Sequence, residues 1–234
     1  MLELKNVWIK YGKNVAVRKL TLTVNKGDFV TILGANGAGK SSTLNAISGL
    51  VKIQRGEIDF KGQKINGLKP GTIAARGIIQ IPEGRKLFPL MSVMENLEMG
   101  AYLCKDNKRI QDSLGKVLAL FPMLKDKLTC KARELSGGQQ QMVAIARGLM
   151  AVPEVLMLDE PSLGLSPLLR QQLAEKIQEV SRSGETIILV EQNARLGLML
   201  ASYGYVMENG QLVLQGKTSD LMQDEGVRKA YLGV

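Results

Sequence analysis

The sequence has 234 residues, of which 45% are apolar and 23% are charged, a composition typical of a globular protein with one large α/β domain. No stretch approaches the roughly 18–20 uninterrupted apolar residues of a membrane span, and residues 1–5 do not begin a signal peptide, so we expect a cytoplasmic protein. The sequence contains no histidine, which excludes a Ser-His-Asp triad and a histidine-ligated zinc site.

The net charge of +9 favours an anionic partner, such as a nucleotide, a nucleic acid or a lipid surface. The basic residues are scattered, and aromatic residues make up only 4% of the chain, so few side chains are available to stack on bases. A basic surface near an anionic membrane is therefore favoured over nucleic-acid binding. Cys104 and Cys130 belong to no CxxC pattern and are expected to be structural or incidental.

The first elements in chain order are expected to be short strands followed by one buried strand. The apolar and alternating segments predict strands at residues 2–4, 7–9, 15–17 and 20–24. Residues 29–33 form a continuous apolar run, which is typical of a strand that is buried in a parallel sheet. That run leads directly into Gly34.

The middle of the chain is expected to be mostly helical, and the last part returns to strands. Ser92 and Glu95 have the spacing of a capping box, which predicts a helix start. Apolar periodicity predicts further helices at 110–120 and 168–180, strands at 155–158 and 186–190, and a hairpin formed by 205–207 and 211–214. Apolar strands that alternate with helices indicate a parallel sheet covered on both faces.

A phosphate-binding loop is expected between the strand at 29–33 and a following helix from Ser42 to Ile47. The segment fits the pattern GxxxxGK[ST], and its members are Gly34, Ala35, Asn36, Gly37, Ala38, Gly39, Lys40 and Ser41. Glycines let successive backbone N–H groups point inward at a triphosphate, and the helix N-terminus adds partial positive charge. We expect Lys40 to reach the β- and γ-phosphates of ATP and Ser41 to ligate Mg²⁺. An ordinary glycine-rich turn is the alternative.

Two carboxylates follow the apolar strand at 155–158. Asp159 is expected to hold Mg²⁺ through water, because magnesium retains part of its hydration shell. Glu160 is placed to polarise the water that attacks ATP. The alternative is that the two acidic residues only end a strand.

A second glycine cluster occurs at the start of a predicted helix, in the segment Ser136, Gly137, Gly138 and Gln139. Ser136 is a good N-cap residue, so a plain helix cap is the structural alternative. A second anion site is not needed for one nucleotide on one chain. A head-to-tail pair of chains does need it, because each cluster then covers the γ-phosphate that the other chain binds.

The motifs GANGAGKS, LSGGQ and VLMLDEP, in this order, resemble those of the ABC-transporter ATPases. The resemblance implies a P-loop NTPase core, an N-terminal antiparallel β subdomain and an α-helical subdomain inserted at about residues 84–150 of a single domain. By position, Tyr11 resembles the aromatic residue that stacks on adenine, although it could simply be a turn residue. Two positions depart from the usual family pattern. Glu83 stands where a glutamine is usual, and Gln192 stands where a histidine is usual.

The segments PEGR, SLGLSP, VEQNA and the terminal Ala230–Gly233 resemble one subgroup, the shorter ATPase subunit of branched-chain amino-acid uptake systems. That resemblance implies membrane-spanning permease subunits, a paralogous ATPase subunit or a homodimer, a periplasmic binding protein, and a location at the inner face of the membrane. Importers of amides or urea share the pattern and stay open.

Two other functions compete with transport. A soluble ABC ATPase that acts on ribosomes or DNA usually has two cassettes or long coiled coils, and this chain has neither. A generic P-loop kinase would not need LSGGQ. If the chain does serve a transporter, the surface from Glu83 to Met99 is expected to receive a helix of the membrane subunit. A cluster of four apolar residues would form that surface unless all four are core: Leu87, Phe88, Leu90 and Met91.

Overall fold

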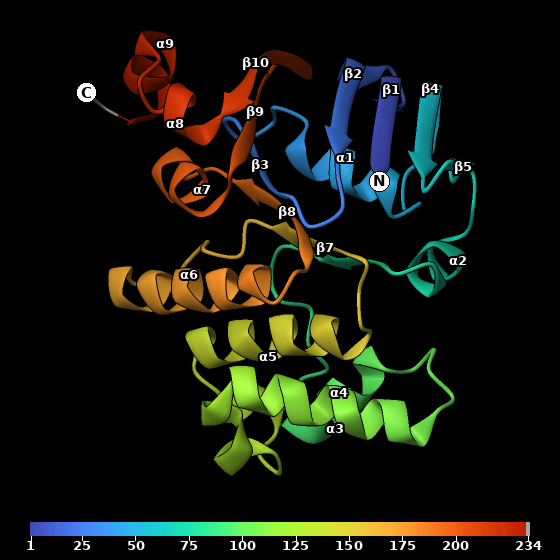
Figure 1. Cartoon of the computed structure of the whole chain (residues 1–234), viewed down its shortest axis with the longest axis vertical. Coiled ribbons are helices and arrows are strands. Elements are labelled where there is room, and N and C mark those ends of the chain that lie inside the picture. The colour runs from blue at the N-terminus through green and yellow to red at the C-terminus, as the bar shows by residue number, and fades with distance from the viewer. Residues whose placement is uncertain (233–234) are drawn as a thin grey trace. The chain divides into compact units, whose positions relative to one another are not determined.

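The computed structural model describes residues 1–232 (Figure 1). The chain divides into two compact units, one made of Met1–Arg76 with the residues from Thr186 onward, the other of Gly77–Glu185. Among the described residues, no helix is both long enough and apolar enough to cross a membrane. Gly233, in the terminal segment that resembles the branched-chain subgroup, lies outside the described residues.

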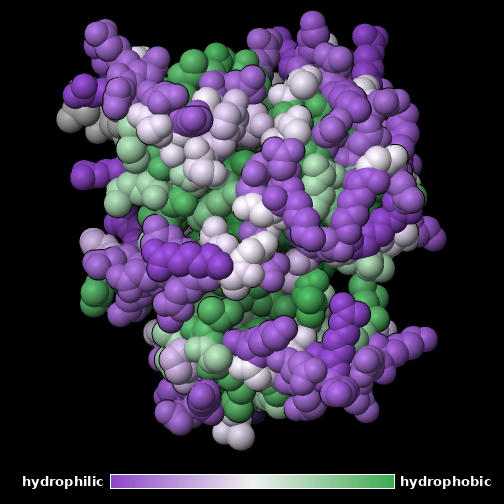
Figure 2. Space-filling model, in the orientation of Figure 1, coloured by the Kyte–Doolittle hydropathy of each residue, from purple (hydrophilic) through white to green (hydrophobic). Residues whose placement is uncertain are grey.

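The first unit contains an antiparallel sheet in the order β2-β1-β4-β5. Its strands are β1 (Leu2–Tyr11), β2 (Asn14–Val24), β4 (Ile53–Phe60) and β5 (Gln63–Lys64). Hydrophilic side chains cover much of the visible face of these strands (Figure 2). The prediction of four short strands before residue 25 was wrong. Asn6 and Lys19 adopt positive φ angles of 50° and 51°, and the register shifts near them, so local bulges break the alternation within two long strands.

The first unit also contains the strand that carries the phosphate loop. β3 (Phe29–Leu33) is fully buried and pairs in parallel with both β8 (Thr186–Glu191) and β9 (Tyr203–Glu208). β9 continues into β10 (Gln211–Lys217) as the predicted antiparallel hairpin, which is confirmed. The helical segments of this unit are α1 (Lys40–Ile47), α2 (Pro70–Ala75), α7 (Ala194–Leu200), α8 (Thr218–Leu221), α9 (Glu225–Val227) and a π-helical turn at Arg228–Leu232.

The second unit is a helical layer beside two parallel strands, β6 (Ile78–Ile81) and β7 (Val155–Asp159). Its helices are α3 (Val93–Gly100), α4 (Asn107–Leu120), α5 (Gly137–Met150) and α6 (Pro167–Arg182), with short 3-10 turns at Pro122–Lys127 and Ala132–Glu134. α5 packs against α3, α4, α6 and β6, and ten of its residues are buried, so it forms the centre of this unit. The predicted capping box of Ser92 and Glu95 is confirmed at the start of α3.

Candidate functional site

The loop between β3 and α1 can be built only with glycine at two of its positions. A Cβ atom on Gly34 would lie 2.3 Å from the backbone oxygen of Met207, and one on Gly39 would lie 2.6 Å from the backbone oxygen of Ala16. Gly39 also has a φ angle of +99°, a conformation that other residues rarely adopt. The loop is therefore wedged against β9 and β2 and curls tightly into the first turn of α1.

The ammonium group of Lys40 is held inside this loop. Lys40 is only 4% exposed, and its Nζ donates to the carbonyl oxygens of Gly34 at 2.8 Å and Ala35 at 3.2 Å. Because α1 begins at Lys40, the N–H groups of its first turn add partial positive charge at the same end of the helix. A buried cation, a helix N-terminus and a glycine curl together fit a polyphosphate group.

The remaining residues of the loop differ in exposure. The three residues at its tip are exposed, and Ala38 is buried beneath them: Ala35, Asn36 and Gly37. Ser41 and Ser42 are half-buried in the first turn of α1. Ser41 is thus at the helix end where a metal held by phosphate oxygens would lie, and its part in metal binding stays a prediction.

Gln192 leaves the sheet beside the phosphate loop. Leu33, the last residue of β3, pairs with Glu191, the last residue of β8, so Gly34 and Gln192 follow neighbouring strands at the same edge. Gln192 is exposed, and the next residue, Asn193, caps α7 by accepting a bond from the Leu196 amide at 3.1 Å. The geometry keeps the amide of Gln192 available at the edge where the phosphate loop begins.

Tyr11 ends β1, and its side chain is 47% exposed. It pairs with Asn14 across the turn that leads into β2, and Ala16 of β2 lies against Gly39 of the phosphate loop. The structure therefore brings the segment after Tyr11 against the loop, while contact of Tyr11 with adenine stays a prediction.

The second unit has its own cluster of candidate residues at a sheet edge. Ile81 at the end of β6 pairs with Leu158 of β7, so the segment containing Glu83 leaves this edge together with Asp159 and Glu160. Asp159 is 4% exposed, whereas Glu83 is exposed. Glu160 has a φ angle of +45°, which is rare outside glycine and typical of residues that their surroundings hold in place at functional sites.

The LSGGQ segment forms the first turn of α5. The Ser136 hydroxyl accepts from the Gln139 amide at 3.3 Å, and the Gln139 side chain accepts from the Ser136 amide at 3.0 Å, so the predicted N-cap is confirmed as a capping box. A Cβ on Gly138 would lie 2.7 Å from the Leu169 side chain, and one on Gly137 would lie 3.1 Å from the guanidinium of Arg85. These glycines accommodate neighbouring side chains, and their contact with a nucleotide stays a prediction.

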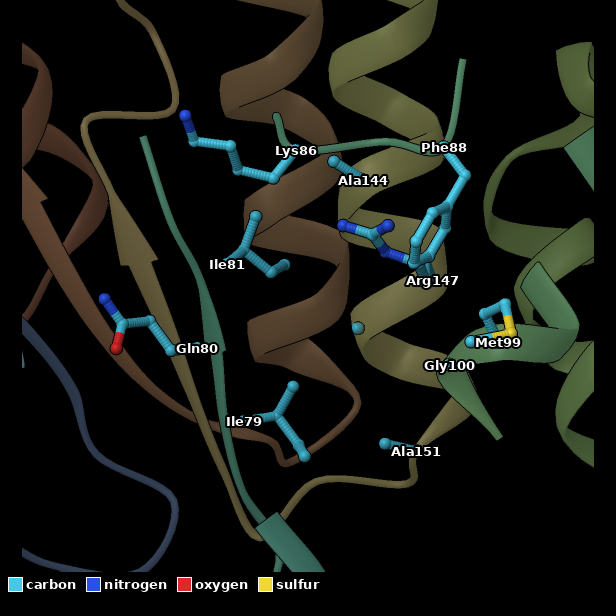
Figure 3. A pocket seen from close by; sticks show the side chains of 11 residues that line it. Ile79, Gln80, Ile81, Lys86, Phe88, Met99, Gly100, Ala144, Arg147 and Ala151 are labelled. Carbon is cyan, nitrogen blue, oxygen red and sulfur yellow. The ribbon is translucent and has the colours of Figure 1, made fainter. Parts of the chain in front are cut away.

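A pocket in the second unit is lined by Arg147, which the sequence analysis missed (Figure 3). Its volume is about 350 Å³, and Phe88, Met99 and Arg147 line it together with residues of β6 and α5. The guanidinium of Arg147 lies over the Phe88 ring, 5.8 Å from its centroid, and burial lowers the pKa of this arginine. Arg147 belongs to no motif, and its partner lies 59 positions earlier, so no local pattern indicates the contact.

The predicted apolar cluster after Glu83 is only partly buried. Phe88 is 43% exposed and Leu90 is 68% exposed, while Leu87 and Met91 are half-buried. The alternative that all four residues are core is therefore wrong. Of the four, only Phe88 lines the pocket.

Comparison with known proteins places these features in context. A family model described as "ABC transporter" matches residues 17–163. The chain is 44% identical over 234 residues, 100% of each protein, to the high-affinity branched-chain amino acid transport ATP-binding protein BraG of Pseudomonas aeruginosa. Among solved structures, the ADP conformation of MJ1267, an ATP-binding cassette of an ABC transporter, has a TM-score of 0.88 at 28% identity and covers 100% of this chain and 99% of that one. Dimeric MJ0796, a bacterial ABC transporter cassette, has a TM-score of 0.82 at 26% identity, covering 93% and 99%.

Proposed function

The chain belongs to the ABC transporter family of ATPases, and from this premise we propose that it powers the uptake of branched-chain, hydrophobic amino acids through separate membrane-spanning subunits. The observation that carries the proposal is the 44% identity to BraG along the whole of both chains. The chain would then lie peripherally at the inner face of the membrane, and a periplasmic binding protein would deliver the substrate.

The phosphate loop and its neighbours in the first unit bind the nucleotide in this proposal. The Lys40 ammonium, already held within the loop, exchanges its carbonyl partners for the β- and γ-phosphates of ATP. Tyr11 stacks on adenine, since the segment that follows it lies against the loop. Gln192 donates its amide N–H to the γ-phosphate and cannot transfer a proton, because a glutamine amide has no relevant pKa.

The carboxylates at the end of β7 serve the metal and the water. From their sequence motifs, Ser41 and Asp159 are each candidate ligands of Mg²⁺, which neutralises phosphate charge when it is bound. Glu160 polarises the attacking water, and in a chain without histidine it is the main candidate for a general base. Glu83 senses the nucleotide state from the segment that leaves the neighbouring strand.

The LSGGQ turn acts on the nucleotide of a second ATPase chain. Residues Ser136 to Gln139 present a helix N-terminus and a serine hydroxyl, which suit a phosphate that arrives from outside the chain. The dimeric state of the similar MJ0796 cassette supports this pairing. The partner is a paralogous ATPase subunit or a second copy of this chain.

The pocket lined by Phe88, Met99 and Arg147 is the docking site for a short cytoplasmic helix of the membrane subunit. Its lining residues Ile81 and Lys86 flank Glu83 in the sequence, so an occupant would act on the segment that joins β6 to the helical layer. An exposed aromatic ring beside a half-buried arginine suits an amphipathic helix. Crosslinks from cysteines introduced at Leu90 and Met99 should reach the membrane subunit, and crosslinks found only from other surfaces would refute this site.

Reconstitution with the membrane subunits and the binding protein in proteoliposomes tests the function. We expect ATP-dependent uptake of leucine, isoleucine and valine, with urea and short amides as competitors that leave uptake unchanged. Uptake of urea or amides in place of these amino acids would reassign the substrate. Co-purification with ribosomes or DNA and without a membrane subunit would overturn transport altogether.

The matched variant for this assay is Glu160→Gln. It should bind ATP normally but hydrolyse it about 100-fold more slowly or worse, because the water loses its base. Retention of near-native hydrolysis in the assembled transporter would remove Glu160 from its role.

A further inference from the structure

The loop that joins β6 to α3, next to the pocket proposed as the docking site, has an unusual backbone. Arg85 and Lys86 follow one another with φ angles of 65° and 43°, and neither is glycine. Two successive non-glycine residues with positive φ angles cost conformational free energy, so this backbone conformation persists only where other contacts fix it. Those contacts come from α5 and involve two arginines.

Each arginine bridges the loop and the helix in a different direction. The Arg147 guanidinium, on α5, donates to the backbone oxygen of Arg85 at 3.2 Å. The Arg85 guanidinium, on the loop, donates to the side-chain oxygen of Gln140 at 3.1 Å. Gln140 and Arg147 are seven residues apart, which is two turns along one face of α5. The loop is therefore fastened to the helix at two points.

The Arg85 side chain connects the loop to the LSGGQ turn. The Gln140 side chain donates to the backbone oxygen of Leu135, immediately before Ser136, at 3.1 Å, and to that of Ala132, in the preceding 3-10 turn, at 3.2 Å. The Arg85 guanidinium also lies against Gly137, where a Cβ would be 3.1 Å from its nitrogens. Arg85 thus contacts the turn directly through Gly137 and indirectly through Gln140.

The backbone of Phe88 is held by hydrogen bonds to α3. The Phe88 amide donates to the Asn96 side chain at 2.9 Å, and the Asn96 side-chain N–H donates back to the Phe88 oxygen at 3.1 Å. Asn96 is fully buried in α3. The Phe88 backbone is thus fixed, while its exposed ring lies beside the Arg147 guanidinium. An occupant that moves the ring therefore acts on Arg147 and, through it, on the backbone oxygen of Arg85.

We propose that Arg85 is a positioning residue that links the docking pocket to the LSGGQ turn. Occupancy of the pocket at Phe88 and Arg147 shifts the loop, and the Arg85 side chain passes this shift to Gln140 and Gly137. The role rests on the proposed function, because the membrane subunit is the occupant.

Two measurements test this role with Arg85→Ala. In the chain alone, hydrogen exchange of the amides from Leu135 to Gln140 should become about tenfold faster, because the charge-assisted bond to Gln140 is lost. In the assembled transporter, stimulation of ATP hydrolysis by the membrane subunits should fall about tenfold in kcat, with KM for ATP unchanged. Arg133→Ala is the matched control, since it removes the same charge from an exposed position near the loop.

Gln140→Ala removes the side-chain oxygen that accepts the hydrogen bond from Arg85, so this variant tests the same contact from the other side. The double variant Arg85→Ala with Gln140→Ala should be clearly less impaired than the sum of the two single variants, because both changes remove the same Arg85–Gln140 hydrogen bond. Additive losses, or an Arg85→Ala variant that behaves like Arg133→Ala in both measurements, would overturn the proposal. If Arg85→Ala does not fold, the exchange and stimulation of Gln140→Ala decide the question alone. A native transporter that shows no stimulation by membrane subunits would instead count against the proposed function.

Discussion

The two glycine-rich turns of this chain look alike in sequence and differ in physical character. In the phosphate loop, Gly34 and Gly39 approach backbone oxygens so closely that a side chain has no room, and Gly39 has a left-handed φ. In the LSGGQ turn, Gly137 and Gly138 have helical backbones, and their close neighbours are the side chains of Arg85 and Leu169. Backbone oxygens cannot move aside as side chains can.

This difference indicates that the backbone of the phosphate loop is rigid, whereas the surroundings of the LSGGQ turn can adjust. The phosphate loop is fixed by β9 and β2, and the Lys40 ammonium donates to the backbone oxygens of the loop. The LSGGQ turn is held by rotatable side chains, so the same residues could settle differently when a second chain or a docked helix is present. Substitutions at matched glycines and serines test whether the phosphate loop is rigid and the LSGGQ turn is adjustable.

Gly34→Ala should have the largest effect. The new Cβ would meet the Met207 oxygen at 2.3 Å, so the loop must move or the sheet must open, at a cost of about 3 kcal/mol or more. Urea unfolding and ATP binding measure the loss. Gly37→Ala is the control, because its φ is +82° but no atom lies within 4 Å, and it should cost only about 1–2 kcal/mol of backbone strain. Equal losses at both positions would show that strain, and not collision, makes the loop rigid.

Ser136→Ala should have an intermediate effect on stability. It removes the hydroxyl of a capping box, which is worth about 1 kcal/mol, and it should also weaken ATP-driven pairing of the chains. Ser92→Ala removes the same hydroxyl from the capping box of α3 and should cost the same stability without affecting pairing. If both variants pair normally with ATP, the turn does not act on a second nucleotide.

Gly138→Ala should change stability by less than about 1 kcal/mol, because Leu169 can rotate away and alanine favours the helix. Gly115→Ala in α4, where no atom lies within 4 Å of the new Cβ, should stabilise the fold by about 1 kcal/mol. This variant measures the contribution of helix propensity alone. A loss as large as that of Gly34→Ala would contradict the adjustable character of the turn. A larger substitution such as Gly138→Asp tests this less cleanly, since it collides with Leu169 in its own chain as well as with any nucleotide.

Gln192→His should have the smallest effect on rate at neutral pH. The position is exposed and follows β8 at the edge where the phosphate loop begins, so an imidazole fits without repacking. The variant should add a titration at about pH 6–7 to the pH profile of hydrolysis, which the native chain lacks. Identical profiles for both proteins would remove residue 192 from contact with phosphate.

Local signals predicted most of the elements. The capping pairs lie three residues apart, so the starts of α3 and α5 could be predicted from neighbours in the chain. The apolar runs of β3, β7 and β8 were equally clear, because strands buried on both faces are almost continuously apolar. The bulges at Asn6 and Lys19 were missed, since a single left-handed residue leaves no periodic signal.

Long-range pairs could not be predicted from the sequence. Arg85 meets Gln140 across 55 positions, and Arg147 meets the Arg85 oxygen across 62. Neither residue type nor spacing selects such partners, because this basic chain contains many other arginines. The same limit applied to the phosphate loop, where the motif predicted a glycine curl but not that Met207 and Ala16 would enclose it.

The first unit is assembled from two stretches of chain, and this has a consequence for the order in which the protein is made. β3 needs β8 and β9 on its two sides, and these strands begin at Thr186 and Tyr203. At about 5–20 residues per second, a ribosome takes roughly 10–30 s to reach them after β3 has emerged. The intervening Gly77–Glu185 unit can fold during this delay. β3 therefore gains both of its neighbouring strands only after the residues of β9 have been synthesised.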